Sequence, residues 1–320
     1  MKKLIGLVFV GLFVLASVSL AQEGKTPTEI SGVIFADYFY NLTEGVAPAA
    51  RSCFEVPRLY ISASRALSDK IKLKATLEGA QPANTLWVKN AFIEFSDVLP
   101  GQNVRGGVIG TPWIGYEEKI WRYRFVAKTF TDIEGVLPPA DNGVGINGKL
   151  AGKLVDYDFN VINGEGYKTA EVSENKDFAA RVSVEPVAGA KVHAYQQIGH
   201  AGTAGTNRDR AIIGVSYEQK AYSAMAYYLA EKDIAVDKSG YSVFGSYNLL
   251  SWLSALGRLD SYDSDTSTPN NSWQRIIFGV STKVSDDVQI ALDYQVKNFE
   301  NTTVQGNNQS MITTHLGIKY

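Results

Sequence analysis

The stretch "DVQIALDYQVKNFE", residues 287–300, shows the pattern that decides the fold. Apolar side chains occupy every second position from Val288 to Val296, and polar side chains fill most of the positions between them. A period of two residues is typical of a β-strand with one apolar and one polar face. The same alternation recurs in "KIKLKATLEG" (70–79), "LVDYDFNVIN" (154–163) and the C-terminal "MITTHLGIKY" (311–320). The pattern therefore predicts an all-β protein.

Alternation of this kind extends from residue 29 to the end of the chain. It predicts about sixteen strands, each close to the ~10 residues with which a tilted strand crosses a bilayer. The predicted strands are 29–40, 54–66, 70–79, 86–96, 103–111, 143–151, 154–163, 177–185, 190–199, 208–218, 220–231, 239–248, 251–262, 272–283, 287–299 and 309–320.

The predicted connections alternate between tight turns, such as "AGK" (151–153), and longer polar loops, such as 164–176. Short turns at one rim and long loops at the other are typical of an up-and-down membrane barrel. A soluble β-sandwich, the alternative, should have fewer strands and mixed loop lengths. We therefore expect a transmembrane antiparallel up-and-down β-barrel of about 16 strands over residues 22–320.

The first 21 residues have the organisation of a secretory signal peptide. Lys2 and Lys3 precede an apolar run from Leu4 to Leu15, which small residues ending at Ala21 follow. A membrane anchor is the alternative, but the run is short for a spanning helix. The sequence thus predicts export and cleavage after residue 21. Together with the predicted barrel, it predicts that the protein lies in the bacterial outer membrane, in contact with the membrane lipid.

Composition limits the remaining function classes. The single cysteine excludes an intramolecular disulfide framework. The formal charge is −2, and removing the two lysines of the signal peptide makes it −4, which argues against nucleic acid as a partner.

One segment breaks the alternation: "GTPWIGYEEKIWRYRFVAKTFTDIEG", residues 110–135. It mixes aromatic residues with charges of both signs, and it belongs to the third and longest of the predicted extracellular loops, about 112–142. A sixteen-stranded barrel is otherwise an open aqueous channel, so we expect this loop to fold into the lumen and narrow it. A catalytic loop and an extracellular recognition loop are the alternatives.

The charged and aromatic residues of this loop and basic residues on the presumed lumen face are the candidate site. The predicted constriction residues are Glu117, Glu118, Lys119, Arg122, Tyr123, Arg124 and Lys128. The predicted pore-wall residues are Arg58, Lys72, Lys74, Arg105 and Arg181.

Five stretches in order, over roughly residues 54–167, resemble the phosphate-selective porin O/P family of outer-membrane channels. They are "FEVPRLYISASRALSDKIKLKATLEG", "NAFIEF", "GGVIGTPW", "YEEKIWRYRFV" and "FNVINGEGY". The resemblance implies a trimeric channel and an anion such as phosphate as solute, although the presumed lumen face here carries both signs of charge. The terminal aromatic Tyr320 is similar to the signal through which such barrels contact the barrel-assembly machinery, by strand addition.

The sequence contains no recognisable catalytic or metal-binding pattern. The three histidines lack HExxH or Cys/His spacing, and "GHAGTAG" (199–205) lacks the Gly-Lys-Ser/Thr of a phosphate-cradling loop. We therefore predict a porin, without enzymatic activity, cofactor or metal, through which small hydrophilic solutes or ions diffuse passively. A non-conducting barrel that serves as an adhesin or structural protein is the main alternative, and a barrel hydrolase is disfavoured by the missing catalytic residues.

Overall fold

The computed structural model describes residues 26–81, 85–202 and 206–320, so the predicted signal peptide, residues 1–21, lies outside the described residues. The strands are β1 (Glu29–Asn41), β2 (Ser52–Ser68), β3 (Ile71–Ala80), β4 (Thr85–Leu99), β5 (Gln102–Gly110), β6 (Ala140–Leu150), β7 (Val155–Ile162), β8 (Asp177–Val187), β9 (Ala190–Ile198), β10 (His200–Ala201), β11 (Thr206–Glu218), β12 (Tyr222–Asp233), β13 (Val236–Asn248), β14 (Leu253–Asp263), β15 (Ser272–Lys283), β16 (Val288–Phe299) and β17 (Gln309–Lys319). The helical segments are η1 (Pro48–Ala50), α2 (Ile114–Trp121), α3 (Phe130–Ile133), η2 (Ala151–Lys153) and α4 (Thr302–Gln305). None of the helices among these described residues has the length and hydropathy to span a bilayer.

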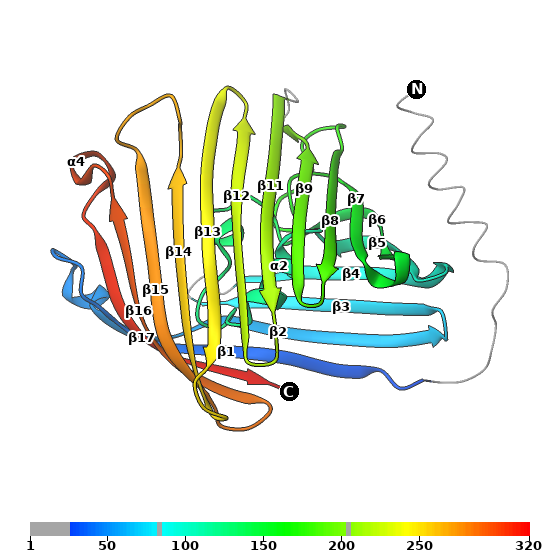
Figure 1. Ribbon diagram of the computed structural model, residues 1–320, viewed down its shortest axis with the longest axis horizontal. Helices are drawn as coiled ribbons and strands as arrows, with labels where there is room; N and C mark the ends of the chain where they lie inside the picture. The colour runs from blue at the N-terminus through cyan, green and yellow to red at the C-terminus, as the bar shows by residue number, and fades with distance from the viewer. Residues whose placement is uncertain (1–25, 82–84, 203–205) are drawn as a thin grey trace.

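Sixteen long strands form one closed antiparallel barrel. Each long strand pairs with its neighbours in chain order, and β1 pairs with β17 to close the sheet. Among the described residues, the short β10 pairs with β11 alone, directly after β9. In Figure 1 the strands of the near wall cross those of the far wall, as tilted strands of a barrel do. The predicted up-and-down barrel is confirmed, and the sixteen strands agree with the predicted ranges to within three residues.

The two faces of each strand differ as the alternation predicts. On β16 the side chain of Leu292 is 50% exposed on the outside, whereas its neighbour Asp293 is 2% exposed on the inside. The same contrast separates Ile276 (37%) from Arg275 (9%) on β15. The outer face is therefore apolar, while charged and hydroxyl side chains are packed within the barrel.

The two rims of the barrel differ in their connections. One rim has only short turns, such as residues 69–70, 188–189 and 219–221, and the other carries the long segments 42–51, 111–139, 163–176 and 300–308. The connection between β12 and β13 departs from the prediction. A loop over 232–238 was expected, but the strands continue to a two-residue turn at Ile234, whose φ is +62°. The β12–β13 ladder extends to the pair Asp233 and Val236, and Asp233 and Lys238 form an ion pair of 2.9 Å at this hairpin.

The segment 111–139 connects β5 to β6 and supplies ten of the 24 buried residues of the hydrophobic core. It contains α2 and α3, and α2 contacts β12 and β13. In Figure 1 α2 lies behind the near wall of the barrel. Trp113, Ile114 and Phe130 are 0% exposed, and they pack on the inward side chains of the wall. We call this segment the inner loop.

Candidate functional site

The inner loop is fixed to one side of the barrel by aromatic packing. Trp113 meets Tyr227 of β12 edge-on at 5.3 Å between ring centroids, and Trp121 meets Phe244 of β13 at 5.4 Å. Such edge-to-face pairs contribute about 0.5–1.5 kcal/mol each beyond their buried area. The indole of Trp121 also donates a hydrogen bond to the backbone oxygen of Ala127, which holds the end of α2 against the following turn.

Glu117 lies at the centre of this packed side. Its carboxylate accepts hydrogen bonds from Trp113 Nε1 (3.1 Å), Thr131 Oγ1 (2.9 Å) and the Tyr227 hydroxyl (2.6 Å). Burial raises the pKa of Glu117 to about 7, although the hydrogen bonds from Tyr227 and Thr131 and the charge of Arg258 oppose the shift. The expectation that Glu117 faces permeating ions is therefore wrong, because the side chain is 0% exposed and serves the loop as an anchor.

Three arginines of the barrel wall hold the inner loop at its beginning, middle and end. Arg181 donates to the Pro112 oxygen at 3.0 Å, Arg258 donates to the Lys128 oxygen, and Arg275 pairs with Glu134 at 2.8 Å. Arg181, one of the predicted wall residues, is 5% exposed, so the structure places its guanidinium beneath the loop.

The opposite side of the inner loop carries a network of charges. Arg124 Nε lies 2.6 Å from Glu118 Oε1, and Arg124 Nη2 lies 3.1 Å from Asp132 Oδ2. Lys128 adds a contact of 3.4 Å to Asp132. Two cations and two carboxylates thus alternate along this face of the loop, and their formal charges cancel.

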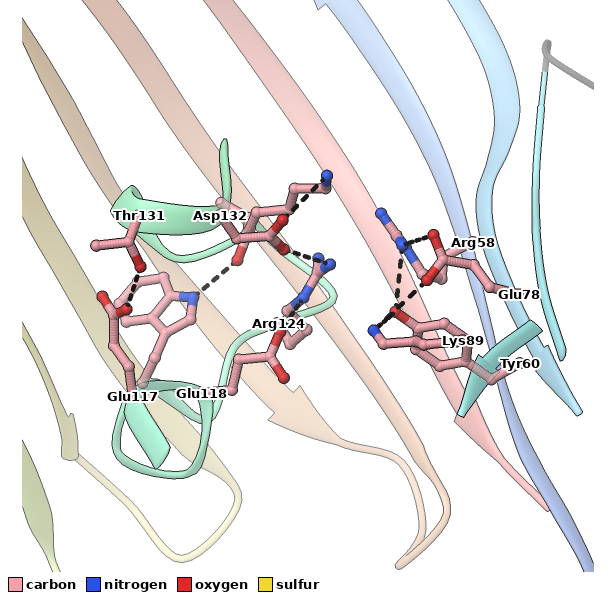
Figure 2. A network of polar contacts seen from close by, with 12 residues as sticks. Arg58, Tyr60, Glu78, Lys89, Glu117, Glu118, Arg124, Thr131 and Asp132 are labelled. Carbon is pink, nitrogen blue, oxygen red and sulfur yellow. Dashed lines mark hydrogen bonds and ion pairs between the residues drawn. The ribbon is translucent and has the colours of Figure 1, made fainter. Parts of the chain in front are cut away.

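A second group of charges lies on the strands that face the loop. Glu78 on β3 pairs with Arg58 of β2 at 2.6 Å and with Lys89 of β4 at 3.5 Å. The hydroxyl of Tyr60 accepts hydrogen bonds from Lys89 (2.6 Å) and Arg58 (3.2 Å). Figure 2 shows Arg124 on the loop and Tyr60 on the wall turned toward each other.

Charges of the wall also act on Lys128 of the inner loop. Burial lowers the pKa of this lysine, and Asp132 opposes that effect. Arg58 on the wall, Arg124 on the loop and Lys168 from the β7–β8 connection each lower the pKa further. Positive charges from different elements thus act on one point of the lumen. We call this meeting of loop and wall the constriction.

A cavity of about 660 Å³ lies between the constriction and the rim of short turns. The inner loop contributes Glu118, Lys119, Arg122, Tyr123 and Arg124 to its lining, and Tyr60 and the turn residues 286–287 line other sides. This volume is many times the volume of about 30 Å³ that one water occupies in the liquid, so hydrated solutes have room in the cavity.

The remaining predicted residues lie around this cavity or on the wall. Lys119 and Arg122 are exposed, and Arg122 approaches Glu218 at 3.5 Å. Tyr123 is 8% exposed and packs against Trp121. Arg105 makes two hydrogen bonds to Asp158, at 2.7 and 2.8 Å. Lys72 and Lys74 share the face of β3 that carries Glu78, and both are exposed.

Two lysines of the site escaped the sequence prediction. Lys89 lies where the β3–β4 register shifts by one residue between Thr76 and Leu77, so its inward direction does not follow from simple alternation. In "LWVKNAF" the apolar residues Val88 and Ala91 are three positions apart, whereas strict alternation needs an even spacing. This irregular spacing is the signal of a bulge that could have revealed the inward direction of Lys89. Lys168 belongs to a connection that the sequence indicated only as an extracellular loop.

Two histidines occupy inward-facing positions on the wall. His193 contacts Ser183 and Ser216, each at 2.9 Å, and His315 contacts Asp37 at 2.8 Å and Asp293 at 3.3 Å. Neither histidine joins a hydroxyl to a carboxylate among the residues that the structure describes. Nucleophilic catalysis by a triad requires that arrangement.

Solved structures share this fold. An anion-selective porin from Comamonas acidovorans superposes with a TM-score of 0.71 at 13% identity, covering 92% of this chain and 99% of that chain. The outer-membrane channel DcaP of Acinetobacter baumannii gives 0.68 at 10% identity over 94% and 99%, and OmpT of Vibrio cholerae 0.65 at 11% over 94% and 100%. No family model and no curated protein matches the sequence. At these identities the likeness establishes the porin barrel fold.

Proposed function

We propose that the protein is an outer-membrane porin through which small hydrophilic solutes diffuse passively, and that its constriction favours anions. The observation that carries the proposal is the inner loop, anchored on one side and presenting charges across the lumen on the other. An apolar outer face suits lipid, and the charged interior suits water.

The preference for anions follows from the charges at the constriction. The loop side is balanced, whereas Arg58, Lys89 and Lys168 share the single carboxylate of Glu78, which leaves an excess of two positive charges. Fixed charge in a narrow aqueous pore acts within a screening length of about 8–10 Å at physiological salt. Anions are therefore concentrated at this point, and cations are depleted.

Planar-bilayer recording tests both parts of the proposal. The purified barrel should give discrete conductance steps, and under a potassium chloride gradient its reversal potential should have the sign of anion preference. Lys119→Glu combined with Arg122→Glu, in the cavity, should shift the potential toward cations, most strongly at low salt. Lys232→Glu, exposed near the β12–β13 hairpin, is the matched control. A well-folded barrel without conductance would favour the adhesin or structural alternative.

The resemblance to the phosphate-selective porin O/P family supports phosphate as a solute. Phosphate added to a chloride solution should reduce chloride conductance if it binds at the constriction.

An OmpT of Vibrio cholerae is described in a trimer form, and we infer a homotrimer here too. Mass measurement in detergent tests this inference, and N-terminal sequencing of the exported chain should begin at Gln22.

A further inference from the structure

The connection between β7 and β8, residues 163–176, also reaches into the lumen. Tyr167 donates a hydrogen bond of 2.9 Å to Glu78 Oε2, and Lys168 Nζ lies 2.9 Å from Glu78 Oε1. The ammonium of Lys168 also lies 4.0 Å from the centroid of the Trp87 ring. A segment that follows β7 therefore meets side chains of β3 and β4, four and three strands away. We call residues 163–176 the second loop.

The backbone of the second loop is fixed at its start. Gly164 donates its N–H to Asp141 Oδ2 at 2.7 Å, and the Tyr167 N–H donates to the Ala140 oxygen at 3.0 Å. Gly166 has a φ of +81°, and a Cβ there would lie 2.8 Å from the ring of Pro138. The "NGEGYK" sequence thus allows the chain to pass close to the end of the inner loop, which directs Tyr167 and Lys168 across the lumen.

The three cations around Glu78 differ in their access to the lumen. The side chain of Lys168 is 37% exposed, whereas that of Arg58 is 10% exposed and that of Lys89 is 13% exposed. Glu78 itself is 0% exposed and cannot contact a solute, but it binds groups from three elements. Its structural effect is to hold the ammonium of Lys168 in place.

We propose that Lys168 is a specificity-determining residue of the channel and that Glu78 is its positioning residue. Selectivity is then set by two loops, of which the second supplies the most exposed cation of the cluster around Glu78. The inference rests on the proposed channel function, and it assigns to Lys168, held by Glu78, the leading part in the anion preference of the constriction.

A simple count of charges makes a different prediction for Glu78. If only the number of charges mattered, Glu78→Gln would raise anion preference, and Lys168→Gln would lower it by the same amount with or without Glu78. If Glu78 positions Lys168, the effect of Lys168→Gln depends on Glu78. A double-mutant cycle measures this dependence.

The experiment compares reversal potentials of the wild type, Lys168→Gln, Glu78→Gln and the double variant under one chloride gradient. Lys168→Gln should shift the potential toward cations, Lys168→Arg should retain most of the wild-type value, and the shift should fall to less than half in the Glu78→Gln background. Lys176→Gln is the control, because Lys176 lies in the same loop and pairs with Glu171 at 3.6 Å. It should leave the potential unchanged.

Two results would overturn the inference while leaving the channel proposal intact. One is a conducting Lys168→Gln barrel whose potential equals that of Lys176→Gln. The other is a Lys168→Gln shift of equal size with and without Glu78. If the Glu78→Gln barrel does not fold, Trp87→Leu takes its place in the double-mutant cycle, because it removes the ring that contacts the Lys168 ammonium. A wild-type barrel without conductance, in contrast, would refute the proposed function itself.

Discussion

The Tyr227 hydroxyl donates a hydrogen bond of 2.6 Å to Glu117, and this contact joins the inner loop to the barrel wall across 110 positions of sequence. Both side chains are almost fully buried. A carboxyl in such a place resists ionisation because the charged form loses its hydration. The loop anchor is therefore a titrating group close to neutral pH.

Glu117→Gln should flatten the pH dependence of stability. Burial raises the pKa of Glu117 to about 7, above the ordinary value of 4.5, so between these pH values the folded state binds more protons than the unfolded state. Stability from this group is complete below pH 4.5, falls as the pH rises toward 7 and is then constant. Apparent unfolding temperatures of the two proteins in detergent, measured from pH 4 to 8, test this expectation.

A measurement of the reversal potential shows whether Glu117 also contributes to ion preference. Because Glu117 is buried, Glu117→Gln should leave the ion preference unchanged at pH values where the loop remains in place. Wild-type and variant unfolding curves with the same slope against pH would show that Glu117 does not titrate in this range.

Arginine substitutions should distinguish the two faces of β16. Leu292 is 50% exposed on the outer face, and Gln289 lines the inner cavity. Arg on the lipid face of a barrel costs about 2–4 kcal/mol at the bilayer midplane, but an inward Arg remains hydrated. Leu292→Arg should therefore lower refolding into lipid vesicles far more than Gln289→Arg. Equal tolerance of the two would mean that the outer face does not contact lipid.

Removal of the inner loop should widen the channel. Deleting residues 113–130 with a short Gly-Ser replacement removes α2 and the Glu118–Arg124 network but leaves every strand of the barrel. Single-channel conductance should rise, and the effect of salt on selectivity should weaken. A shortened 300–308 connection is the control, because it lies on the same rim and supplies no residue to the cavity. Equal conductance of both deletions and the wild type would place the inner loop outside the permeation path.

The barrel was predictable because alternation repeats sixteen times and depends only on neighbouring residues. Leu292 and Asp293 reveal their faces within a single strand. The inner loop was also recognisable, since 111–139 lacks that alternation and is rich in aromatic residues. The direction of each side chain in this loop was harder to predict, because a helix inside a barrel has one side on the wall and another toward the lumen.

The sequence did not reveal which charge lay on which side. Glu117 and Glu118 are adjacent and chemically alike, yet one is buried against Tyr227 and the other pairs with Arg124 at the constriction. Lys168 depends on a different kind of information. Its partner Glu78 is 90 positions away, and only the closed barrel brings the two together. Long-range pairing of this kind leaves no local pattern to read.

The seam between the two ends of the chain gives the final prediction. Gly32 and Tyr320 exchange backbone hydrogen bonds of 2.8 and 3.1 Å. The Tyr320 hydroxyl also donates a hydrogen bond of 3.2 Å to the backbone oxygen of Tyr60. A Cβ on Gly32 would lie 2.2 Å from that same oxygen and 2.5 Å from the Tyr320 ring. The last residue therefore packs across β1 onto β2, and only glycine leaves room for it.

Deleting Tyr320 should lower the amount of folded, heat-modifiable barrel, because the end of the chain then loses the contacts of Tyr320 with Gly32 on β1 and Tyr60 on β2. Gly32→Ala should act at the same seam with Tyr320 present, at a cost of about 1–3 kcal/mol for overpacking. Gly115→Ala, where a Cβ meets no atom within 4 Å, is the matched control and should fold normally. The yield of folded barrel relative to exported chain measures the effect, since the seam is required for closure and not for export. A full yield from both seam variants would show that pairing of β1 with β17 closes the barrel without this contact.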